Sequence, residues 1–68
     1  MNRRLYVVEQ PLPASMVDDS GFRRTFKQGE TLWWDGDQSS NSAIFEVDNI
    51  RFQADLKLFL ASVRVPGT

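Results

Sequence analysis

Oxygen-bearing side chains recur at alternate positions in the polar middle of the chain. They fit positions 1, 3, 5, 7 and 12 of the loop that binds calcium between two helices, and these residues are Asp35, Asp37, Ser39, Asn41 and Glu46. The template requires a glycine at position 6, where this chain has a serine, and the flanking segments favour strands over helices. We therefore interpret the segment as a solvated loop and expect no metal site.

Catalytic chemistry has few candidate residues. The chain contains no cysteine and no histidine, so it lacks a thiol nucleophile, a Cys/His zinc site and the commonest general base. No nucleophile forms a recognisable pair with the candidate acids, and 68 residues leave little room for a pocket of about 300 Å³ or more. We expect neither an enzyme nor a cofactor-binding protein. The candidate acids are Glu9, Glu30, Asp35 and Asp37.

Arginine dominates the positive charge, and Arg23 and Arg24 are adjacent. Arginine suits bidentate contacts with phosphate or carboxylate and stacks on aromatic rings. With Trp33, Tyr6 or Phe22, these side chains could form a small surface for single-stranded nucleic acid. The net charge of −1 and the neighbouring pairs of aspartates argue against that function, because they repel a phosphate backbone. Nucleic-acid binding is therefore our alternative function.

Aromatic side chains give the best indication of function. In a strand, Trp33 and Trp34 point to opposite faces, so one enters the core and the other lies on or near the surface. Tryptophan, tyrosine and arginine dominate the energetics of protein interfaces. We expect a non-catalytic module for protein–protein interaction, with self-association as a homodimer as one form of it. The predicted binding residues are Trp33, Trp34, Tyr6, Arg23, Arg24, Met16 and Leu12, with Pro13 beside them.

Composition indicates one small folded domain over residues 1–68. Hydrophobic residues make up 41% of the chain and charged residues 25%, which is typical of a globular protein. No apolar run approaches the length of a membrane span, and the run at 5–8 is too short for a signal-peptide core. We expect a cytoplasmic protein without a membrane partner.

Strands and loops alternate along the first two thirds of the chain. The segment 10–21 contains two prolines and is interpreted as a long ordered loop, which makes it a candidate recognition surface. The segment 35–42 is interpreted as a polar loop, and Gly29 suits a turn that needs positive φ. β-Forming residues predict strands at 5–9, 22–26 and 31–34.

A hairpin at residues 43–54 is the clearest structural prediction. Asp48 and Asn49 both tolerate positive φ and suit its two-residue turn. This register puts apolar pairs on one face and polar pairs on the other, and a slip of one residue would exchange the faces. The core-facing pairs are Val47 with Ile50, Phe45 with Phe52 and Ala43 with Ala54. The solvated pairs are Glu46 with Arg51 and Ile44 with Gln53.

The residues after Asp55 favour a short helical turn. Their apolar side chains follow the i, i+3, i+4, i+7 spacing of a helix, and Asp55 can cap its first turn. A strand that aligns three leucines is the other interpretation of this segment. A terminal edge strand is expected at 62–65, before a proline. The predicted core residues are Phe45, Phe52, Val47, Ile50, Leu32, Phe26 and Leu60.

This order of elements resembles an SH3-like barrel. The segment 26–30 is similar to the turn that leads into the second SH3 strand, the segment 10–25 stands where the RT loop lies, and 48–49 would be the distal turn. The tryptophan pair precedes the polar loop, whereas SH3 domains carry theirs after it. The acidic and proline–tyrosine elements of the SH3 peptide groove have no clear counterparts here. The resemblance implies a mainly β fold, a small barrel or bent antiparallel sheet of about five strands with one short helical turn. It does not imply binding to proline-rich peptides.

Overall fold

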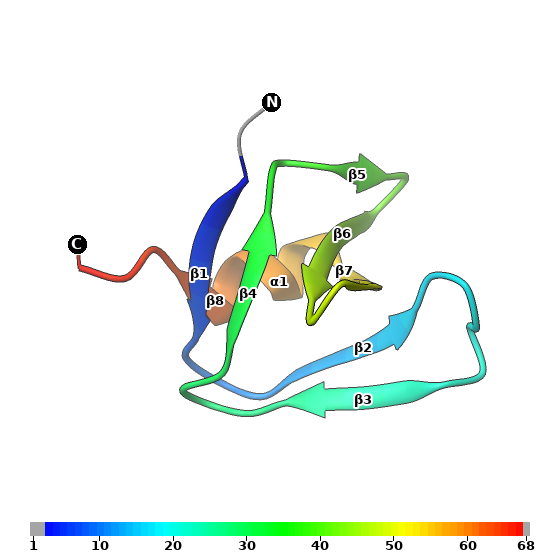
Figure 1. Cartoon of the computed structure of the whole chain (residues 1–68), viewed down its shortest axis with the longest axis horizontal. Helices are drawn as coiled ribbons and strands as arrows, with labels where there is room; N and C mark the ends of the chain where they lie inside the picture. Colours follow the sequence, from blue (N-terminus) through cyan, green and yellow to red (C-terminus); the bar gives the residue numbers. More distant parts are fainter. Residues whose placement is uncertain (1–2, 68) are drawn as a thin grey trace.

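Eight strands and one short helix follow one another along residues 3–67, the part of the chain that this computed structural model describes. They are β1 (Arg4–Val8), β2 (Leu12–Met16), β3 (Arg23–Phe26), β4 (Thr31–Trp34), β5 (Gln38–Ser39), β6 (Ser42–Val47), β7 (Ile50–Asp55), α1 (Leu56–Ser62) and β8 (Val63–Arg64). The strands form one antiparallel sheet in the order β3-β2-β7-β6-β4-β1-β8, with β5 paired to β6 (Figure 1).

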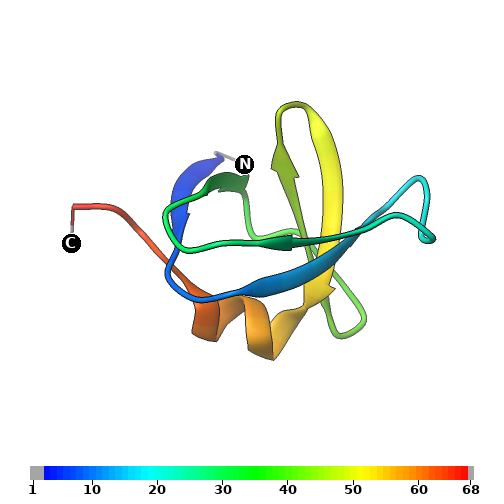
Figure 2. The same cartoon turned by 90° about the horizontal axis from the view of Figure 1, so that it is seen from below.

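The sheet curls into a half-barrel around a core rich in phenylalanine. Figure 1 shows β1 and β4 side by side and the β2–β3 hairpin running away from them, and Figure 2 shows α1 on one side of the curled sheet. The mainly β fold with a bent antiparallel sheet and one short C-terminal helix is thus confirmed, with eight strands where about five were expected. The largest fully buried side chains are Phe26, Phe45, Phe59, Leu12, Leu32 and Val8.

The prediction of a continuous loop at 10–21 is wrong, because Leu12–Met16 forms β2. This strand pairs with β3 over four residues and with β7 through Ser15 and Met16 only. Successive amides of a strand point to alternate neighbours: the Met16 amide donates toward β3, and the Val17 amide donates to Arg51 of β7. By this alternation the nitrogen of Pro13 points toward β7, at a position beyond the end of the β2–β7 pairing. The missing amide of Pro13 therefore costs no ladder hydrogen bond. The segment 35–42 also contains a two-residue strand, β5.

The predicted hairpin is confirmed in turn and register. Asp48 and Asn49 have φ values of 52° and 67°, and all the predicted cross-strand pairs are present between β6 and β7. Ile50 departs from its predicted place in the core, with 42% of its surface exposed. It is the first residue of β7, directly after a turn whose residues are exposed as well. Gly29 has the expected positive φ, 95°.

The helix confirms one interpretation of the C-terminal segment. The Asp55 carboxylate accepts a hydrogen bond from the Leu58 amide at 3.1 Å, which is the predicted N-cap. Phe59 is fully buried, but Leu60 is 55% exposed and does not belong to the core as predicted. Successive helical residues are rotated by about 100°, so a two-turn helix that buries Phe59 turns Leu60 outward. The terminal strand is present as β8, paired with β1.

Replacing Ser62 by alanine is expected to stabilise the domain by about 1 kcal/mol. Ser62 is fully buried at the end of α1, and its hydroxyl has no hydrogen-bond partner within residues 3–67. An unsatisfied buried hydroxyl costs about 1–3 kcal/mol, and alanine is also the better helix former. Urea denaturation measures the change, with Ser20→Ala at an exposed loop position as control. A loss of stability in Ser62→Ala would contradict this expectation, because it would mean that the hydroxyl makes a favourable interaction in the folded protein.

Candidate functional site

The two tryptophans of β4 lie on opposite faces of the sheet, as their adjacency predicted. Trp34 is half-buried, with its ring centroid 4.8 Å from that of Phe59 and 5.7 Å from that of Tyr6. Its indole N–H donates to the Asp37 carbonyl oxygen at 3.0 Å. Trp33 points the other way and keeps 42% of its surface exposed. Trp33 is therefore the outward tryptophan, and Trp34 belongs to the rim of the core.

A row of cross-strand neighbours extends from Trp33 across the outer face of the sheet. Trp33 is opposite Leu5 of β1 on one side and opposite Glu46 of β6 on the other. Glu46 is in turn opposite Arg51 of β7. Side chains of directly opposed residues point to the same face, so this row places one aromatic, one aliphatic and two charged side chains together.

Ion pairs fix the charged side chains around Trp33. The Arg3 guanidinium lies 5.4 Å from the Trp33 ring centroid and also pairs with Glu46. Arg51 instead approaches the Asp37 carboxylate, at 3.7 Å. The predicted cross-strand pair of Glu46 and Arg51 is present, but each of the two charges makes its ion pair with a residue outside the hairpin. Arg3 and Asp37 lie outside the hairpin, and they pair with Glu46 and Arg51, which would otherwise pair with each other.

A small depression of about 140 Å³ lies beside the Trp33 ring. Three carboxylates and two guanidiniums contribute to it, so its formal charge is negative. Asp35 accepts a hydrogen bond from the Asp37 amide at 2.9 Å and has no ion-pair partner within residues 3–67. We call this depression the tryptophan site, and its lining residues are Arg3, Trp33, Asp35, Asp37, Ile44, Phe45, Glu46 and Arg51.

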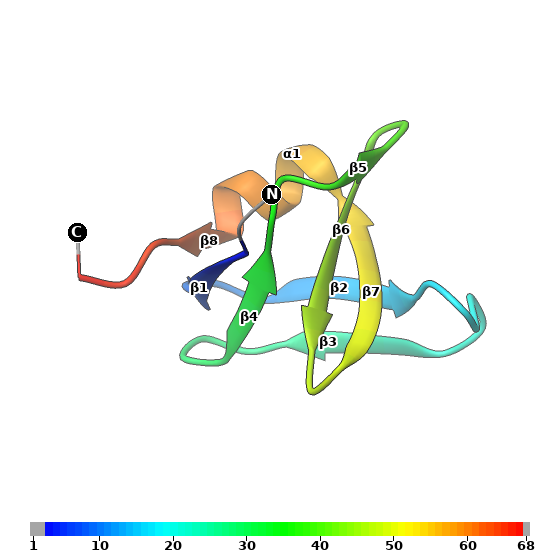
Figure 3. The same cartoon turned by 45° about the horizontal axis from the view of Figure 1, so that its top comes forward.

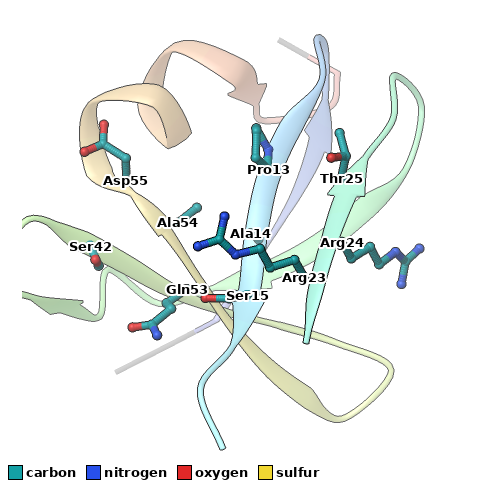
Figure 4. A pocket seen from close by; sticks show the side chains of 10 residues that line it. All are labelled: Pro13, Ala14, Ser15, Arg23, Arg24, Thr25, Ser42, Gln53, Ala54 and Asp55. Atoms are coloured by element: carbon teal, nitrogen blue, oxygen red, sulfur yellow. The ribbon is translucent and has the colours of Figure 1, made fainter. Parts of the chain in front are cut away.

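A larger open groove of about 700 Å³ lies on the same sheet, farther toward β3 (Figure 4). Its lining includes two alanines of the core, Ala14 and Ala54, and most of its other lining residues are polar. Figure 4 shows the Arg23 side chain reaching across β2 into this groove, whereas Arg24 points away from it. We call it the Arg23 groove, and its lining residues are Pro13, Ala14, Ser15, Arg23, Arg24, Thr25, Ser42, Gln53, Ala54 and Asp55.

The predicted binding residues do not form one surface. Trp33 and Arg23 are exposed, but Arg24 is tied to Glu30 by an ion pair and lies over the Phe26 ring at 4.4 Å. Leu12 is fully buried, so its assignment to a binding surface is wrong. Pairing with β3 draws β2 into the sheet and turns Leu12 into the core. The predicted residues that are half-buried against the core are Tyr6, Trp34 and Met16.

Of the residues that line the tryptophan site, the predicted binding residues include Trp33 alone and omit its neighbours, among them Arg3, Asp35 and Ile44. Because side chains alternate between the two faces of a strand, the predicted hairpin puts Ile44 on the same face as Glu46. What the sequence could not supply is the pairing of β4 with β6, which brings that face to Trp33.

The residues that matched the calcium template lie in β5 and β6 and in the segments before and between these strands. Ser39 is in β5 and Glu46 in β6, where Glu46 pairs with Arg3, while Asp37 pairs with Arg51. Within residues 3–67, no three acidic side chains gather in a way that could hold a metal ion.

Two further observations concern the chain as a whole. Within residues 3–67 the single helix has seven residues, too few to cross a bilayer. Comparison with protein-family models, with curated proteins and with solved structures finds no match for this chain. Its function must therefore be argued from the two surface features described above.

Proposed function

We propose that this chain is a non-catalytic module that binds another protein through the tryptophan site. The observation that carries the proposal is Trp33, a large aromatic side chain that is exposed on a regular strand, with the Arg3 guanidinium over its ring. A rigid, exposed tryptophan next to arginine and an aliphatic side chain is the composition of an interface hot spot. Ile44 supplies the aliphatic side chain here.

We further propose that the half-barrel is SH3-like. The supporting features are the β2–β3 hairpin in place of an RT loop, the tight turn between β6 and β7, and the helix that returns the chain to β8 beside β1 (Figure 3). The likeness concerns the arrangement of strands alone. It carries no ligand preference, because the tryptophan site is built from other residues than the SH3 peptide groove.

A protein partner fits the tryptophan site better than a nucleic acid does. Asp35, Asp37 and Glu46 all line it, and only Arg3 and Arg51 oppose them. A phosphate backbone stacked on Trp33 would lie against these carboxylates, and charge repulsion would weaken its binding. A protein can offer an apolar or cationic side chain to the same place.

Replacing Trp33 by alanine is expected to lower affinity for the protein partner by about 30-fold or more, the effect of losing a hot-spot side chain. The wild-type domain and the variant are each immobilised, and the proteins that each captures are identified by mass spectrometry. Captured proteins are then purified, and their affinities for the two domains are measured by titration. Phe22→Ala is the matched control, because Phe22 is a similarly exposed aromatic (50%) that does not line the tryptophan site. Circular dichroism verifies that both variants fold.

Three other results would change the conclusion. Equal capture by wild type and Trp33→Ala would remove the tryptophan site from the function. Binding to a single-stranded oligonucleotide that weakens steeply with salt would favour the nucleic-acid alternative. A mass of twice 7.8 kDa in light scattering, reduced to one chain by Trp33→Ala, would identify the partner as a second copy.

A further inference from the structure

The Arg23 groove arises from the divergence of two strands. β2 and β7 pair only at Ser15 with Gln53 and Met16 with Phe52. Beyond these pairs β7 turns into α1, while β2 continues beside β3, and the space between them opens on the outer face (Figure 4). Ala14 and Ala54, whose side chains belong to the core, line this space where the two strands part.

Arg23 brings an unpaired positive charge to this groove. No acidic side chain within residues 3–67 forms an ion pair with it, in contrast to the adjacent Arg24, which is paired with Glu30. Its guanidinium presents five donors in a planar fork that matches a carboxylate. The side chains around it add hydrogen-bond donors, and these are Ser15, Thr25, Ser42 and Gln53.

The groove and the tryptophan site lie on one continuous face. Ile44, which lines the tryptophan site, is directly opposite Gln53. Gln53 is opposite Ser15, and Ser15 is opposite Arg23. Trp33 is opposite Glu46, two residues from Ile44 on β6, and four strand spacings separate Trp33 from Arg23, so the path along the curled sheet is roughly 20 Å. An extended peptide covers that length with about six residues.

We propose that the Arg23 groove binds an acidic side chain of the same peptide segment that Trp33 contacts. This rests on the proposed function, and it adds the chemistry of the partner: an extended segment with an apolar side chain at Trp33 and a carboxylate about six residues away. One guanidinium balances the single charge of a carboxylate. A phosphate would bring a larger negative charge near Asp55, which lines the same groove.

Selection from a phage-displayed library of random dodecapeptides tests this inference on the full chain. Wild-type protein is expected to enrich peptides with Asp or Glu at a fixed spacing from an aromatic or aliphatic residue. Arg23→Glu is expected to enrich Lys or Arg at that position instead. For a synthetic peptide of the selected acidic sequence, Arg23→Glu should lower affinity by at least about ten-fold, the weight of a charge-assisted hydrogen-bond pair.

Lys57→Glu is the matched control, because it makes the same change of charge at an exposed helical residue that does not line the groove. It should change affinity less than two-fold. Selected peptides without an acidic preference, or equal affinity for wild type and Arg23→Glu, would overturn the inference. If those peptides bound the wild type but not Trp33→Ala, the proposed function would hold and only the role of the Arg23 groove would be rejected. A library that shows no enrichment also overturns the inference, and the capture experiment with Trp33→Ala then decides the proposed function.

Discussion

Replacing Phe45 by alanine is expected to lower the free energy of unfolding by about 3–5 kcal/mol, which is most or all of the stability expected for a domain of this size. The Phe45 ring is stacked on Phe59 at 5.2 Å and on Phe52 at 6.1 Å, and it meets the edge of Phe26 at 5.6 Å. It therefore joins the hairpin, the helix and β3 in one cluster. Its removal leaves a cavity that these three elements cannot fill without leaving their positions.

The size of this domain makes the loss decisive. A chain of 68 residues with no cysteine has no disulfide to restrain it, and its whole stability is expected to be on the order of 5 kcal/mol. Thermal and urea unfolding followed by circular dichroism measure the change. Phe22→Ala is the control, because Phe22 is 50% exposed and its loss should cost less than about 1 kcal/mol. A cooperatively folded Phe45→Ala with nearly wild-type stability would contradict the aromatic core.

Replacing Trp34 by alanine is the second change with a large expected effect, a loss of about 3 kcal/mol of stability. The ring packs edge-on against Tyr6 and Phe59, and its N–H holds the Asp37 carbonyl oxygen at 3.0 Å. The variant loses apolar contacts of β1 and α1 together with a hydrogen bond that anchors the turn before β5. Both losses act on the folded state, so the melting temperature should fall by well over 10 °C.

Trp33→Ala provides the contrast on the adjacent residue. Its ring is 42% exposed and loses mainly the contact with the Arg3 guanidinium, which is worth about 0.5–1 kcal/mol. Stability should therefore fall with Trp34→Ala, and binding should fall with Trp33→Ala. Equal loss of stability in the two variants would show that Trp33 also contributes to the folded core.

The hairpin could be predicted from the sequence because its determinants are local. Asp48 and Asn49 specify the turn, and alternation on either side of them specifies the register. The Asp55 cap and the helix after it are local in the same sense, since the carboxylate bonds an amide three residues away. Such features need no knowledge of the rest of the chain.

The strand at Leu12–Met16 could not be predicted because its cause is distant. Two prolines favour a loop, and only pairing with β3 and β7 shows that Pro13 sits where no amide is needed. The same pairing buries Leu12, which the sequence placed on a binding surface. Leu60 shows the opposite error, because its place in the helical pattern did not reveal which side of a two-turn helix the core would cover.

The ion pairs also depend on contacts between residues that are distant in the sequence. Register predicted Glu46 opposite Arg51, and the register is correct. Each charge nevertheless found a different partner, Arg3 and Asp37, from elements that only the folded sheet brings near. Long charged side chains on an exposed face can pair with any opposite charge within reach, so distance along the sequence is a poor guide to their pairing.

By itself, the sequence determined that the two tryptophans face opposite ways, that the hairpin pairs phenylalanine with phenylalanine, and that thiol and imidazole chemistry are absent. The tertiary structure decided which tryptophan faces outward and that Arg24, but not the adjacent Arg23, has a counter-ion. The physical reason is that alternation along a strand fixes the relative orientation of neighbours only. Their absolute orientation depends on which face packs against Phe59 and Tyr6, and those residues lie far from β4 in the chain.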